Sequence, residues 1–291
     1  NIIKNSSRPD LDGYYYELGV YLRAPGYTDA SRATFSVTGN TFYNAGRVGL
    51  VTHDYINTTV TGNVFYKDIA DFGYAMEIGS QSTGTISGNT VYGYDTPAAS
   101  DGSGSAGIYI ENCFTASVTG VVKTVIVEDN EIYDCQAGLH VGNEFDGYAG
   151  DVHIVLTLNG NDFHDNLEAG VIIADEDKES GSSVTVTGGG NTIANNGDYG
   201  YYIYTLGDGA ISVDLSEETI SGQATGVMLE EIPGSSSYSI AITDGTIGGN
   251  SDYGVNNAIS GVTLDVTNNW WGDASGPAPI GSGDLVVGLV D

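Results

Sequence analysis

Four ionisable residues, Arg23, His53, Glu77 and Glu111, follow one another at intervals of 30, 24 and 34 residues. Two carboxylates held about 5 Å apart suit the acid and nucleophile of a retaining glycosidase. An imidazole and a guanidinium beside such a pair would tune its proton transfers. The residue types therefore predict an acid–base site, provided that the fold brings all four side chains together.

Aromatic residues recur at related positions and predict a binding surface. Flat rings with one polar edge stack against sugars, and acidic residues beside them accept hydrogen bonds from hydroxyl groups. The expected carbohydrate-binding or partner-binding residues are Tyr21, Tyr109, His140, Tyr202 and Tyr204.

Acidic turns suggest a cation site. Asp146, Asp175, Glu176 and Asp177 lie in turns that follow expected strands, and clustered oxygen ligands are what calcium requires. Their spacing matches neither an EF-hand nor a nonapeptide calcium repeat, so a solvated acidic edge is the alternative. Calcium is the only cofactor that the sequence suggests.

An internal repeat supplies the elements that must position these residues. One pattern, Gly-Asn-x-apolar, a polar turn, then Gly-apolar-x-apolar, recurs with a mean period of about 29 residues. Copies of its first half begin at Asn1, Gly39, Gly62, Gly88, Asp129, Gly160, Gly190, Glu218, Gly245 and Asn269. Each period holds three short alternating stretches and no helical pattern. We therefore expect an all-β parallel β-helix of about ten three-strand coils.

Stacking the coils predicts which residues face outward. Alternation along the second strand places Arg23, His53, Glu77 and Glu111 in one outward column, beside a column that contains Tyr21 and Tyr109. Glu77 and Glu111 would then lie on adjacent coils, about 5 Å apart. Any two acids in one column share that spacing, so a purely structural pair is the alternative to a catalytic one.

Two polar columns are expected to be structural. Asn occupies the first at eight of ten copies, which fits a turn that needs a left-handed residue and side-chain amides that hydrogen-bond from coil to coil. Asn44, Asp134, Asp165 and Asn195 form the second column.

The repeats resemble those of the right-handed parallel β-helix repeat family, which includes pectate-lyase-like and surface repeat proteins. The segment 267–277, TNNWWGDASGP, is similar to the terminating segment of its extracellular members. The resemblance implies right-handed coils and a carbohydrate-related role. The repeats span residues 1–272, and we expect residues 273–291 to add a strand or cap that covers the open end of the solenoid. It supplies no catalytic residue, because branches of this superfamily place their chemistry differently.

Composition limits the partners. The chain of 291 residues carries 38 acidic and 8 basic residues, for a formal charge of −30, which disfavours nucleic acid and anionic membranes. The sequence contains no run of about 20 apolar residues, so it predicts no transmembrane segment. Cys113 and Cys135 fall at different points of the repeat, and we expect two unpaired thiols. These features and the resemblance predict an extracellular or cell-surface protein.

Two functions remain open. The first is a non-catalytic structural or adhesive module that binds glycan or a neighbouring protein on one strand face. The alternative is a carbohydrate-active enzyme, a polysaccharide glycosidase or lyase, with its site around Glu77 and Glu111. A groove with converging polar groups at these residues would favour the enzyme, whereas a flat ladder would favour binding.

Overall fold

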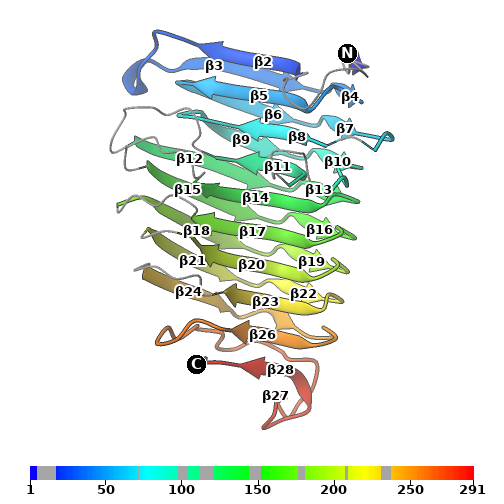
Figure 1. Cartoon of the computed structure of the whole chain (residues 1–291), viewed down its shortest axis with the longest axis vertical. Helices are drawn as coiled ribbons and strands as arrows, with labels where there is room; N and C mark the ends of the chain where they lie inside the picture. The colour runs from blue at the N-terminus through cyan, green and yellow to red at the C-terminus, as the bar shows by residue number, and fades with distance from the viewer. Residues whose placement is uncertain are drawn as a thin grey trace.

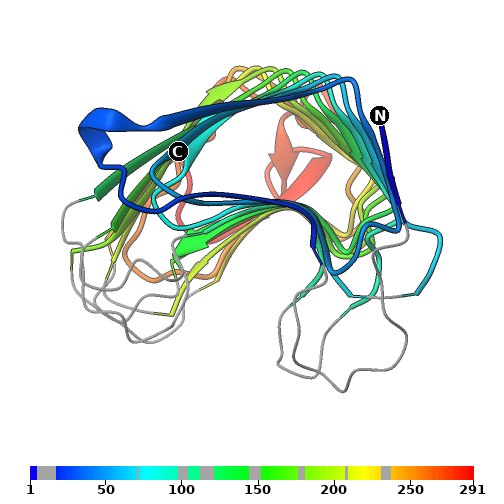
Figure 2. The ribbon, with the colours of Figure 1, turned by 90° about the horizontal axis from the view of Figure 1, so that it is seen from above.

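The computed structural model is an elongated stack of parallel strands with the two chain ends at opposite poles (Figure 1). It describes residues 1–4, 18–70, 72–97, 104–111, 121–143, 152–175, 181–206, 209–230 and 237–291. Three sheets run the length of the stack and enclose its core, as the view down the axis shows (Figure 2). The predicted all-β parallel β-helix is confirmed.

We call the three sheets A, B and C in the order in which the chain visits them. Sheet A contains β1 (Ile2–Lys4), β4 (Thr41–Tyr43), β7 (Val64–Tyr66), β10 (Thr90–Tyr92), β13 (Glu131–Tyr133), β16 (Asp162–His164), β19 (Thr192–Ala194), β22 (Thr219–Ser221) and β25 (Thr246–Ile247). Sheet B contains β2 (Leu18–Ala24), β5 (Val48–Asp54), β8 (Tyr74–Ile78), β11 (Ala106–Ile110), β14 (Ala137–Asn143), β17 (Ala169–Asp175), β20 (Tyr199–Thr205), β23 (Thr225–Glu230), β26 (Tyr253–Asn257), β28 (Gly283–Val287) and β27 (Pro277–Ala278). Sheet C contains β3 (Ala33–Thr38), β6 (Ile56–Thr61), β9 (Thr83–Ser87), β12 (Val121–Glu128), β15 (Val152–Asn159), β18 (Ser183–Gly189), β21 (Ala210–Ser216) and β24 (Ser237–Thr243).

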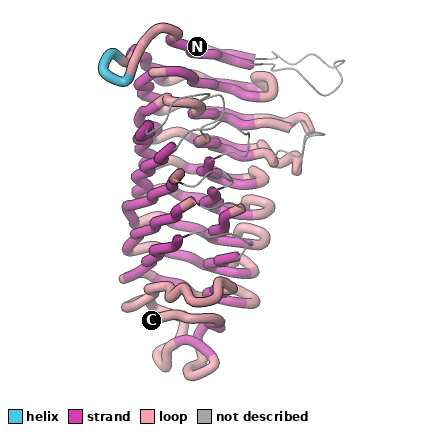
Figure 3. The backbone as a smooth tube through the Cα atoms, turned by 60° about the vertical axis from the view of Figure 1, so that its left-hand side comes forward, coloured by secondary structure: helices cyan, strands magenta, loops and turns pink. Residues whose placement is uncertain are grey.

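Eight turns carry a strand in every sheet, and a ninth carries β25 and β26, so the expected count of about ten coils is approximate. The one described helix is the short 3-10 helix η1 (Asp29–Ser31) near the N-terminal pole (Figure 3). Among the described residues, no helix is long and apolar enough to cross a membrane.

Alternation along each strand builds the core. In β15 and β18 the buried positions are aliphatic and the intervening ones are partly or fully exposed. One continuous cluster of buried side chains runs through the coils and includes stacked Phe42 and Phe65, whose ring centroids lie 4.2 Å apart. A single coil cannot bury this face alone, so the core stabilises only the stack.

A buried asparagine ladder joins the coils at the corner before sheet A. The side-chain amide of Asn130 donates to Oδ1 of Asn161 at 3.0 Å, and that of Asn161 donates to Oδ1 of Asn191 at 2.9 Å. The same pattern links Asn40, Asn63 and Asn89. The predicted coil-to-coil hydrogen bonds are therefore present.

The expected left-handed backbone lies one residue before this ladder. Gly62, with φ +64°, adopts it ahead of Asn63, and Asp129, with φ +55°, adopts it ahead of Asn130. The asparagines themselves do not, because their amides must point along the axis into the stack. The left-handed backbone expected at the ladder asparagines also occurs in the second polar column, with φ of 47° to 55° at Asn44, Asp134, Asp165 and Asn195.

Glu218 takes the place of an asparagine in the ladder. Its Oε1 accepts from the Asn191 amide at 2.8 Å and its Oε2 accepts from the Tyr201 hydroxyl at 2.6 Å. Burial raises the pKa of Glu218 to about 7, despite these hydrogen bonds.

Replacing Asn161 with Ala should remove five side-chain hydrogen bonds at once, including donation to Val127 O at 2.9 Å. Because the partners stay buried, we expect a loss of about 3 kcal/mol or more in the free energy of unfolding, measured by chemical denaturation. Thr187→Ala, on the exposed face of sheet C, is the control and should change it by less than about 0.5 kcal/mol.

Glu218→Gln tests the titration in the ladder. The pKa of Glu218 rises from 4.5 to about 7 on folding, so its contribution is most favourable below pH 4.5 and is lost as the pH rises towards 7. Glutamine does not titrate. The variant should therefore gain up to roughly 3 kcal/mol relative to the parent between pH 4.5 and pH 8. Denaturation curves that keep the same difference at both pH values would contradict the assignment.

Candidate functional site

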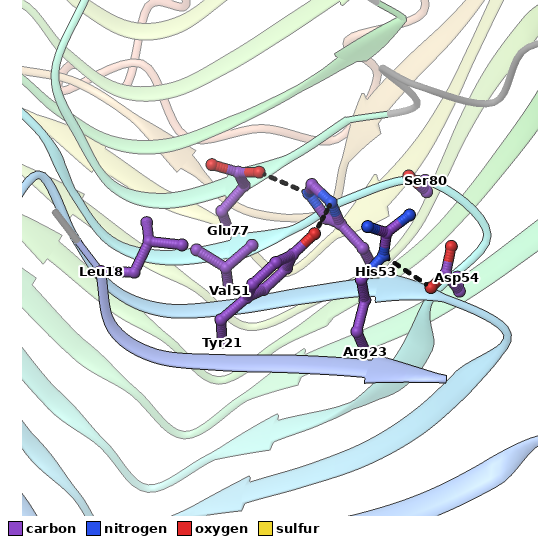
Figure 4. A pocket seen from close by; sticks show the side chains of 8 residues that line it. All are labelled: Leu18, Tyr21, Arg23, Val51, His53, Asp54, Glu77 and Ser80. Carbon is purple, nitrogen blue, oxygen red and sulfur yellow. Dashed lines mark hydrogen bonds and ion pairs between the residues drawn. The ribbon is translucent and has the colours of Figure 1, made fainter. Parts of the chain in front are cut away.

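A pocket of about 470 Å³ lies on the outer face of sheet B near the N-terminal pole, and we call it the N-terminal pocket (Figure 4). Its lining residues come from β2, β5 and β8 and from the turn that follows β8. They are Leu18, Tyr21, Arg23, Val51, His53, Asp54, Glu77 and Ser80.

Three side chains of this pocket form a continuous hydrogen-bonded chain. The Tyr21 hydroxyl lies 3.1 Å from Nδ1 of His53, and Nε2 of His53 lies 2.8 Å from Oε1 of Glu77 (Figure 4). The Tyr21 ring meets the imidazole edge-on, at 89° and 5.3 Å between centroids. Tyr21 is 43% exposed whereas His53 is 9% exposed, so the chain leads from the protein surface inward.

Glu111 lies behind this chain. One ligand atom from each of His53, Glu77 and Glu111 can be chosen so that all three lie within 4.8 Å of one another. Glu111 is fully buried and does not line the pocket. A Cβ atom on Gly79 would approach Glu111 Oε1 at 2.4 Å and His53 Nε2 at 2.6 Å, so the approach requires glycine there.

The predicted column is wrong at Glu77. In the ladder Val51 pairs with Glu77 and Glu77 pairs with Tyr109, whereas Glu111 follows the last pair, between Ile78 and Ile110. Glu77 and Glu111 lie on adjacent coils, but not at equivalent positions.

Ala75 explains the two-residue shift. It occupies the place that Gly49 has in the adjacent coil, whereas the repeat pattern, which looks for glycine, selects Gly73 and so misplaces Glu77 by two residues. Despite the shift, the two carboxylates still approach each other, with one oxygen of each within 4.8 Å of the other.

Lys123, which sequence reasoning left unassigned, anchors the site from inside. Its ammonium group is fully buried and donates to the carbonyl O of Glu111 at 2.5 Å, to that of Ser80 at 3.3 Å and to that of Ile78. These carbonyls belong to the chain on both sides of Gly79 and to the next coil. The signal was available, because Lys123 occupies the apolar phase of β12 together with Val125 and Val127.

Arg23 lies at the rim. Its Nε donates to Oδ2 of Asp54 at 2.9 Å, and its side chain is 57% exposed. The hydrogen bond to Asp54 raises the pKa of Arg23. All four arginines of the chain lie at or before Arg47, so the pocket sits at the more basic end of an acidic rod.

Of the predicted binding residues, Tyr21 lines the pocket, and the other four lie along the same face beyond it. Tyr109 stacks on Tyr74 at 4.7 Å and meets His140 at 4.9 Å, edge to face. Burial lowers the pKa of His140 to about 4, so its imidazole is neutral near neutral pH. Much of this face forms a second apolar cluster, which includes Val51, Tyr109 and Ile172.

Farther along, Tyr202 packs between Tyr199 and Tyr204, with centroid distances of 4.7 and 4.8 Å. The Tyr202 hydroxyl donates to Glu230, and burial together with this hydrogen bond raises the pKa of Tyr202. The aromatic residues thus form two groups, one beside the pocket and one several coils away.

The predicted calcium turns are mostly outside the described residues. The residues outside the described ranges are Asp146, Glu176 and Asp177, and also Cys113. Asp175 ends β17 fully buried, with its Oδ2 where a Cβ on Gly209 would be, so it does not lie at a solvated edge. Calcium at these turns stays a prediction. Cys135 is a free buried thiol, and burial raises its pKa to about 12.

A family model described as the right-handed β-helix region matches residues 27–229. No curated protein matches the chain. Crystal structures of the periplasmic alginate epimerase AlgG are similar in fold. A single-residue mutant aligns with a TM-score of 0.62 and 14% identity over 87% of this chain and 55% of that one. Another AlgG structure aligns with a TM-score of 0.58 and 15% identity over 82% and 51%. The chain thus spans about half the length of these proteins.

Lys123→Met should destabilise the protein, because three buried carbonyl oxygens would lose their charged donor while the aliphatic stem is kept. We expect a loss of about 3 kcal/mol in the free energy of unfolding by chemical denaturation. The matched control is Thr124→Ala, the exposed neighbour on β12. An equal effect of the two substitutions would show that Lys123 does not anchor the site.

Proposed function

We propose that this chain, which belongs to the right-handed β-helix family, acts on a carbohydrate polymer by proton transfer in the N-terminal pocket. The hydrogen-bonded chain of Tyr21, His53 and Glu77 carries the proposal. An imidazole oriented by a carboxylate and joined to a phenol hydroxyl is suited to taking a proton from one atom and returning one to another. The site is a pocket with converging polar groups and not a flat ladder, which favours an enzyme over a binding module.

Burial disfavours the glycosidase mechanism. A retaining pair must present both carboxyl groups to opposite sides of the glycosidic bond. Glu77 and Glu111 have a suitable separation, but Glu111 is fully buried behind Gly79 and would not reach a sugar. His53, Tyr21 and Glu77 are the accessible acid–base groups, with Glu111 a positioning residue.

Proton abstraction next to a carboxylate is the reaction class that fits these groups. In a uronic-acid polymer, His53 or Tyr21 would take the proton from C5. Return of a proton to the opposite face of C5 gives epimerisation. Breakage of the C4–O bond, with a proton passed to the leaving oxygen, gives elimination. The fold likeness to an alginate epimerase supports this substrate class.

Charge placement supports an acidic substrate at this end of the rod. Arg23, whose Nε pairs with Asp54, is an exposed cation at the rim and would also contact a substrate carboxylate there. The rest of the chain, at −30 overall, would repel a polyanion, so cations in solution should assist binding.

The outer face of sheet B is the proposed path of the polymer. From β8 to β20 the chain climbs four coils, about 19 Å, which places Tyr202 and Tyr204 several sugar units away from Glu77. Tyr109 and His140 lie between them. If a polysaccharide binds along this path, the protein acts outside the cytoplasm, where such polymers occur.

The second candidate is a non-catalytic module that binds glycan or a neighbouring protein, structural or adhesive, on the same face. The apolar and aromatic cluster that extends well beyond the pocket favours it. Both candidate functions use the same surface, and they differ in whether the N-terminal pocket catalyses a reaction of the bound polymer.

Activity on uronic-acid polymers separates the two candidates. We would measure ultraviolet absorbance of unsaturated products and exchange of the C5 proton by NMR. His53→Gln, Tyr21→Phe and Glu77→Gln should each lower turnover by about 10²- to 10⁴-fold, with folding checked by circular dichroism. His153→Gln, on sheet C, is the matched control and should retain activity.

Binding of the same polymers is measured in parallel by calorimetry. Binding without turnover in the parent protein would support the non-catalytic candidate. Turnover that survives all three pocket substitutions would reject the proposed relay.

A further inference from the structure

We propose that His53, Glu77 and Glu111 bind one divalent transition-metal ion, of which Zn²⁺ is the representative. The three ligands come from successive coils: His53 from β5, Glu77 from β8, and Glu111 immediately after β11. One ligand atom of each lies within 4.8 Å of the other two, so a modest adjustment would bring all three onto a single ion.

Charge supplies the driving force. Glu111 is fully buried and the Glu77 side chain is 13% exposed, so two carboxylates approach each other where solvent screens them weakly. Lys123 reaches the backbone carbonyl of Glu111 and contributes one positive charge nearby. A divalent cation held by the two carboxylates and the imidazole would cancel the charge of the carboxylates.

The surrounding residues already fix the ligands in place. Nδ1 of His53 is held at 3.1 Å by the Tyr21 hydroxyl, which leaves Nε2 turned towards the two carboxylates. Such outer partners orient a metal-binding imidazole. Lys123 fixes the backbone of Glu111, and the missing side chain at Gly79 keeps open the space that Glu111 Oε1 and His53 Nε2 share.

The ligand set selects the kind of ion. One imidazole nitrogen with two carboxylate oxygens suits Zn²⁺, Co²⁺ or Mn²⁺, whereas Ca²⁺ takes six to eight oxygens. Three protein ligands would leave one position of a tetrahedral ion for water or substrate, and two of the ligands, His53 and Glu77, line the N-terminal pocket. The site is distinct from the acidic turns near Asp175.

Metal and proton relay would use the same atoms. Nε2 of His53 and Oε1 of Glu77 are hydrogen-bonded to each other at 2.8 Å, and an ion bound by both would replace that bond. If the proposed function holds, bound Zn²⁺ inhibits turnover; this consequence rests on the proposed function, whereas metal binding does not.

Calorimetric titration of ZnCl₂ into the metal-free full chain tests the site. We expect one saturable high-affinity site per chain, and an affinity at least tenfold lower in His53→Gln, in Glu111→Gln and in Gly79→Ala, whose methyl group fills the shared space. Tyr21→Phe should weaken binding about tenfold. His153→Gln is the control and should bind as the parent does, and CaCl₂ should not compete.

Visible absorption of the Co²⁺-loaded protein provides a second readout, because d–d bands report imidazole and carboxylate ligation and would be lost in His53→Gln. Absence of a saturable site, or equal affinity in the parent and in both His53→Gln and Gly79→Ala, overturns the proposal. Zn²⁺ binding that leaves turnover unchanged would keep the metal site and reject the relay. Turnover that depends on His53, in a protein that binds no Zn²⁺, would keep the relay and reject the metal site.

Discussion

In-register stacking of the coils, held by the buried asparagine ladder, is the constraint on which every other feature depends. The Asn161 amide, for example, hydrogen-bonds to backbone and side-chain partners in three coils, so a coil that slipped by one residue would bury unpaired polar groups and turn its apolar face outward. Because register is fixed in this way, residues 24 to 34 positions apart in the chain become neighbours in space. His53, Glu77 and Glu111 meet only for this reason.

Among the described residues, two of the places that bury ionisable groups bear on the stack and on the site, and each has its own compensation. Glu218 extends the ladder with a carboxyl whose raised pKa favours the protonated form. Lys123 and Glu111 lie together at the corner after sheet B, where the ammonium group binds three carbonyl oxygens. Leaving any of these groups without partners inside the stack would cost more than a typical surface substitution. The second place lies directly behind the N-terminal pocket, which ties the stability of this corner to the geometry of the site.

The two faces of sheet B differ in what they contact. Its inner face belongs to the continuous core, and its outer face carries a second apolar cluster bordered by ionisable groups near the N-terminal pole. All four arginines lie at or before Arg47, so the N-terminal end of the stack is less negative than the rest. A carboxylate-bearing polymer would meet the least repulsion at the N-terminal pocket.

The repeat alone determined the architecture, the ladder and the assignment of most residues to the core, because a period of about 29 residues with three alternating stretches allows few other folds. It also placed Arg23, His53, Glu77 and Glu111 near one another. Only the tertiary structure decided the rest. Ala75 stands where other coils have glycine, so Glu77 pairs with Tyr109, and Gly79 opens the space in which Glu111 approaches His53. The contact between Tyr21 and His53 likewise depends on side-chain direction across coils, which spacing along a sequence does not encode.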